Sequence, residues 1–97
     1  MRYFHRAHAT PEQVLAQAAE FFAGRGFRVE KGPGDHARFT GLLGTVYIHV
    51  VIEGGHYTRV DLATGAVGES DLDKRVKRFL GELHRAEEPG YALRGAY

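Results

Sequence analysis

Residues 45–62, TVYIHVVIEGGHYTRVDL, hold two alternating segments on either side of a glycine pair, and this stretch decides the fold. In the first segment every second residue from Val46 onward is a branched aliphatic one, and the second has Val60 and Leu62 in the same phase. A period of two is typical of a β-strand with one buried face. Gly54 and Gly55 favour a tight turn, so the stretch predicts a β-hairpin.

The length of the hairpin loop determines which side chains share a face. A two-residue turn would pair Glu53 with His56 and place aliphatic residues beside polar ones. A three-residue loop over residues 54–56 pairs Glu53 with Tyr57 instead and leaves one face apolar along its length. Because a slip of one residue turns every side chain to the other face, burial favours the three-residue loop.

Further elements flank the hairpin on both sides. Thr10-Pro11 is typical of a helix start, with Gln13 placed to complete a capping box, and two nearby glycines stop that helix. Ser70 is expected to cap a second helix that carries a continuous apolar stripe. The predicted order is β-α-β-β-β-β-α, with elements at residues 2–8, 10–24, 27–30, 36–41, 45–53, 56–63 and 70–88.

This order predicts an α+β fold with two layers. A mostly antiparallel sheet of five strands would have both helices on one face, because two helices cover only one side of such a sheet. We expect one domain over residues 1–97, with its core at about 2–88 and a C-terminal tail at 89–97. The order over residues 2–88 resembles that of TBP-like and helix-grip domains. The resemblance implies DNA binding on the sheet in one case and a ligand cavity between sheet and helices in the other.

Composition limits the classes of partner. Thirteen Lys and Arg against twelve Asp and Glu give a net charge of +1, which provides no long-range attraction to nucleic acid or anionic lipid. The chain has no cysteine, and its six histidines lack the spacing of metal ligands, so we expect no metal and no cofactor. No apolar run approaches the length of a membrane span, and a cytoplasmic protein is the expectation.

The face of the hairpin opposite the apolar one is the candidate interaction surface. The three-residue loop places His49 opposite Asp61, but we see neither a third metal ligand nor a nucleophile beside this pair, so enzyme activity is not favoured. In the tail, aromatic and aliphatic residues recur with only one charge, and we expect it to pack on its own domain or on a neighbouring subunit. The candidate residues are Tyr47, His49, Val51, Tyr57, Arg59, Asp61, Tyr91, Leu93 and Tyr97.

The favoured function is a small self-associating, non-enzymatic interaction module, most simply a homodimer. Tyr and Arg on an uncovered sheet are typical of interfaces. A solvated face with cross-strand ion pairs remains an alternative. A helix-grip domain that binds a small apolar ligand and a nucleic-acid platform are the others. The only basic cluster lies at residues 74–78 and has acidic residues around it. We therefore interpret it as a solvated helix face rather than as a nucleic-acid binding site.

Overall fold

The computed structural model describes residues 1–32, 34–55, 57–65 and 70–87, and its elements follow the predicted order. The α+β fold class is confirmed, and each element begins and ends within a few residues of its expected bounds. The described residues form β1 (Arg2–Ala7), α1 (Pro11–Ala23), β2 (Arg28–Lys31), β3 (His36–Gly41), β4 (Gly44–Glu53), β5 (Tyr57–Thr64) and α2 (Asp71–Glu87).

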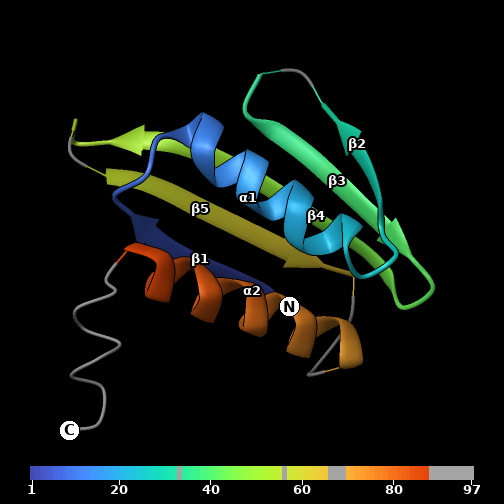
Figure 1. The fold of residues 1–97 in the computed structure, drawn as a ribbon. Helices are drawn as coiled ribbons and strands as arrows, with labels where there is room; N and C mark the ends of the chain where they lie inside the picture. The colour runs from blue at the N-terminus through green and yellow to red at the C-terminus, as the bar shows by residue number, and fades with distance from the viewer. Residues whose placement is uncertain (33, 56, 66–69, 88–97) are drawn as a thin grey trace, which may run out of the picture.

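The five strands form one antiparallel sheet in the order β1-β5-β4-β3-β2. Both helices lie on the same side of it, α1 over β2, β3 and β4, and α2 over β1, β5 and β4 (Figure 1). The predicted hairpin register is confirmed, because Glu53 pairs with Tyr57 and His49 with Asp61. We call the side toward the helices the inner face and the opposite side the outer face.

A cluster of phenylalanine side chains lies between the helices and the inner face, at the centre of a core otherwise made of aliphatic residues. Phe22 of α1 stacks on Phe39 of β3 at 4.8 Å between ring centroids, and Phe79 of α2 lies 5.7 Å from Phe22. All three side chains are fully buried. On this side the described residues leave a recess of about 250 Å³ at the edge between α1 and the strands β2 and β3. This recess is smaller than the usual volume of a ligand pocket.

Two details of the inner face differ from a simple alternation. Ile52 has the phase of the buried residues but is 62% exposed, because it lies near the β4–β5 turn, at the far end of the strand. In β1 the short sequence left the orientation open. The structure places Phe4 on the outer face and Tyr3 and His5 on the inner face, since Tyr3 pairs with Leu62 and His5 with Val60.

Both helices begin with the capping interactions expected from their sequences. The Thr10 hydroxyl accepts from the Gln13 backbone N–H at 3.2 Å, and the Gln13 side chain accepts from the Thr10 N–H at 2.9 Å. At α2 the Asp73 N–H donates to the Ser70 hydroxyl at 3.3 Å, and the Ser70 N–H donates to the Asp73 carboxylate at 3.0 Å. The Asp73 side chain is fully buried. Its place in the polar first turn of a helix did not indicate this burial.

Candidate functional site: the outer face of the sheet

Every second residue of the strands points away from the helices, so the outer face is a surface built from all five strands. The register places six of the candidate residues on it, Tyr47, His49 and Val51 from β4 and Tyr57, Arg59 and Asp61 from β5. The remaining candidates, Tyr91, Leu93 and Tyr97, lie outside the described residues. Because β4 and β5 are adjacent strands of the sheet, these six residues form one continuous patch.

Large apolar groups are exposed on this face. Phe4, Tyr47, Val51 and Tyr57 are between 38% and 54% exposed. Phe4 pairs with Asp61 across β1 and β5, and its ring lies 5.0 Å from the Arg59 guanidinium. Sequence reasoning missed Phe4, because aromatic and histidine side chains occupy successive positions in β1 and hide the alternation.

Ion pairs interleave these apolar groups. Arg38 donates to both oxygens of the Glu30 carboxylate, at 3.0 and 3.1 Å. Glu53 accepts from Arg6 at 2.7 Å and from Arg59 at 3.4 Å, and Arg59 also donates to Asp61 at 3.1 Å. The carboxylates of this face are therefore held by arginines of the same protomer.

These hydrogen bonds alter the acidity of the groups that share them. The bond from Arg38 holds the pKa of Glu30 below its ordinary value, and the attraction between the opposite charges adds to this. The bond from Arg6 lowers the pKa of Glu53 in the same way. Both carboxylates thus remain charged well into the acidic range, and the pairs persist at neutral pH.

His49 and Asp61 lie opposite each other as predicted, but their side chains make other contacts. The carboxylate of Asp61 accepts from Arg59, two residues away on the same strand. The ring of His49 stacks on His36 of the neighbouring strand, with 4.2 Å between centroids and 6° between planes. The cross-strand neighbours His49 and Asp61 are thus held by different partners, His36 and Arg59.

A hollow of about 770 Å³ lies in the outer face. Its floor includes Ala63, which stands between Tyr47 on β4 and Arg2 on β1. Because alanine contributes only a methyl group, the longer side chains on both sides rise above it. Sequence analysis could not find this hollow, since it depends on pairing between residues about sixty positions apart.

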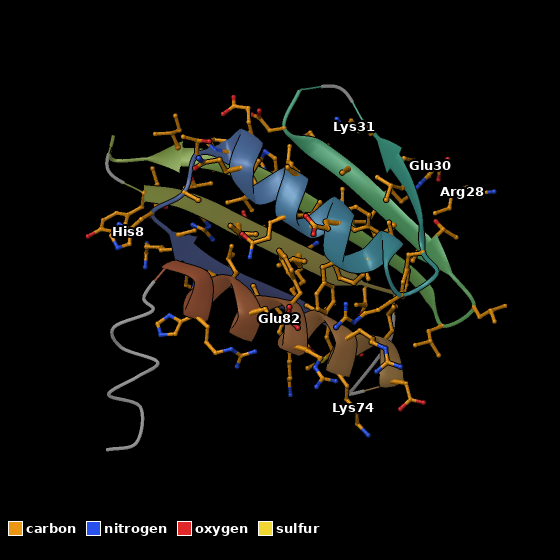
Figure 2. All side chains as sticks on the ribbon, viewed as in Figure 1. His8, Arg28, Glu30, Lys31, Lys74 and Glu82 are labelled. Atoms are coloured by element: carbon orange, nitrogen blue, oxygen red, sulfur yellow. The ribbon has the colours of Figure 1, made fainter. Side chains whose placement is uncertain are left out.

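The other histidines and basic residues do not form a second site in the described chain. His5 and His84 meet edge to face at 6.2 Å between β1 and α2, and the His8 ring lies 5.3 Å from Tyr57. Among the described residues no group of three or more potential ligands is close enough to hold a metal ion. Lys74 of α2 extends away from the sheet and lies 3.8 Å from Asp71 (Figure 2).

A scan of known protein families and a search of curated proteins both found no match to this chain. Within the described ranges, neither helix has the length and apolar character needed to cross a bilayer.

Proposed function

We propose that this protein is a non-enzymatic interaction module that forms a homodimer through the outer face of its sheet. The observation that carries the proposal is the composition of that face. Large apolar side chains are exposed there while the neighbouring carboxylates are already paired with arginines of the same protomer. A second copy of the chain, which brings the same amphipathic surface, is the occupant that we favour.

Pre-formed ion pairs make the face suitable for contact with another protein surface. A charge that is buried without a partner is strongly unfavourable, whereas a hydrogen-bonded pair loses less on desolvation. Nucleic acid binding instead needs cations that can replace the counterions of phosphates. Arg38, which lies opposite Tyr47, and Arg59, which lies beside Phe4, are engaged by Glu30, Glu53 and Asp61.

The size of the face suits a small dimer. Five strands about 4.8 Å apart and roughly seven residues long at about 3.3 Å each span on the order of 550 Å² per protomer. Two copies would bury about 1,100 Å², just above the minimum of about 1,000 Å² for a specific interface and below the area of most stable ones. We therefore expect a dissociation constant on the order of micromolar rather than an obligate dimer.

The charge of the face predicts how the dimer responds to salt. Its five arginines (Arg2, Arg6, Arg28, Arg38 and Arg59) exceed its three carboxylates (Glu30, Glu53 and Asp61). Arg28 extends from β2 at the edge of the sheet (Figure 2). Two such faces repel each other weakly, so added salt should strengthen the dimer by screening. Binding to a polynucleotide would weaken with salt instead.

The variant Val51→Glu tests the proposal by sedimentation velocity. Position 51 lies opposite Arg59, so the new carboxylate gains a partner and the fold should be retained. The variant replaces an exposed apolar side chain with a carboxylate that must be desolvated in both copies, and this cost should exceed the weak repulsion that it relieves and weaken self-association by about tenfold. Leu42→Glu is the matched control, because Leu42 is fully exposed in the β3–β4 turn, away from the outer face. Equal dissociation constants for the two variants would refute the proposed interface.

A further inference from the structure

We infer that the hollow in the outer face binds a small planar aromatic acid, a flat ring system with a carboxylate or phosphate group. The hollow is formed by residues of one protomer and lies within the face that the proposed dimer would bury, so the ligand and a second copy would compete for this surface. Its volume of about 770 Å³ lies within the range of small-molecule sites.

The charges that line the hollow favour an anion. Arg38 and Arg59 are held by Glu30 and Asp61, which also line it, and these four charges cancel. Arg2 remains, and it makes no ion pair within the described part of the chain. Lys31 pairs with Ala37 of the inner face, so its side chain belongs to the helix side of the sheet and does not add to this charge. Arg2 lies on β1, an edge strand of the sheet, so the surplus of positive charge comes from one side of the hollow.

The rings that line the hollow favour a flat ligand. Phe4 and Tyr47 are about half exposed and offer apolar ring surface beside the methyl group of Ala63. The His36 and His49 rings, stacked at 4.2 Å, contribute a further planar wall. Aromatic side chains stack on flat ligands, and arginine binds carboxylate and phosphate in a bidentate manner.

Two probes distinguish the source of the negative charge. Isothermal titration calorimetry with 2-naphthoate tests the carboxylate, and adenosine 5′-monophosphate tests the phosphate. We expect saturable binding of at least one of them at submillimolar concentration. The uncharged 2-naphthylmethanol lacks the negative charge, and inorganic phosphate lacks the aromatic ring. Each should bind at least about tenfold more weakly than the aromatic acid.

Matched variants locate the binding. Ala63→Leu fills the floor and Arg2→Gln removes an uncommitted cation, and each should weaken binding by about tenfold. Val51→Leu and Arg6→Gln make the same kinds of change on the outer face beyond the residues that line the hollow, and should leave affinity within about twofold. Val51→Glu keeps the hollow, so its binding separates this inference from the proposed dimer.

The inference is wrong if neither acid binds the Val51→Glu variant, in which the hollow is free of a second copy, at millimolar concentration. It is also wrong if 2-naphthylmethanol binds as tightly as 2-naphthoate, or if Ala63→Leu and Val51→Leu bind the acid equally well. In the supporting case, amide chemical shifts in NMR spectra move at residues 47, 49 and 63 and remain fixed along α2.

Discussion

The buried carboxylate of Asp73 should be one of the largest polar contributions to stability in this protein. One of its oxygens accepts from Tyr3 Oη and Thr64 Oγ1, both at 2.9 Å. The other accepts from the Ser70 N–H at 3.0 Å and from the Ser70 hydroxyl at 2.7 Å. These bonds join the start of α2 to β1 and to the end of β5.

We predict that Asp73→Ala lowers the free energy of unfolding by about 2–4 kcal/mol, because the buried Thr64 hydroxyl and the partly buried Tyr3 and Ser70 donors lose their acceptor, and one half of the capping box is lost. For a chain of this size that loss corresponds to a decrease in Tm of roughly 10–25 °C. Asp73→Asn should cost less, about 1 kcal/mol, since one oxygen remains and the hydroxyls of Tyr3 and Thr64 can rotate to accept from the amide.

Urea unfolding followed by circular dichroism measures these changes. Asp71→Ala is the control, because Asp71 is an exposed acidic residue in the same helical turn and should change stability much less. If Asp73→Ala and Asp71→Ala differ by less than about 0.5 kcal/mol, the buried network does not stabilise the fold as argued.

The same carboxylate gives stability a defined pH dependence. Burial raises the pKa of Asp73, but the hydrogen bonds from Ser70, Tyr3 and Thr64 together lower it from 3.8 to about 2. Because the folded value is below the unfolded one, the contribution is complete above the unfolded pKa and is lost as pH falls toward 2. Stability of the wild-type protein should therefore fall between pH 4 and 2, and more steeply than that of Asp73→Asn.

Three further predictions concern the core, a turn and the tail. Phe22→Ala should lower the free energy of unfolding by about 3–5 kcal/mol in denaturant titrations, because it removes the ring that stacks on Phe39; a loss below about 1 kcal/mol would contradict this. Gly41→Ala should lower the Tm, since the new Cβ would meet the Phe27 ring at 3.0 Å, and an unchanged Tm would show that this ring moves freely. Deletion of residues 89–97 should lower the Tm or weaken the dimer, whereas no effect on either would show that the tail is a loose end.

The sequence predicted the fold wherever a periodic pattern was long enough. In β4 and β5 the aliphatic alternation and the glycine loop determined the register, and the structure has Val50 opposite Val60 as expected. In β1 the pattern was ambiguous because three successive positions, 3–5, carry ring side chains and the strand has only six residues. Tertiary contacts resolve its orientation, since Tyr3 Oη reaches Asp73, seventy residues away.

The candidate site was also predicted only in part, because some of its residues meet through contacts between segments that are distant in the sequence. Neighbours on β4 and β5 followed from the hairpin, so six candidate residues lie on the outer face. Phe4, Arg2 and Ala63 meet only through the pairing of β1 with β5, and no local pattern indicates that pairing. Likewise the Asp61 carboxylate accepts a hydrogen bond from Arg59 of its own strand rather than from its cross-strand neighbour His49. Which of the two partners it takes depends on side-chain geometry, which the sequence pattern does not specify.

Static light scattering of the wild-type protein over a concentration series tests the central proposal most directly. We predict that the molar mass rises from 10.8 kDa toward twice that value across the micromolar range. The midpoint should move to lower concentration as salt is added. A constant mass of 10.8 kDa up to millimolar concentration would contradict self-association through the outer face.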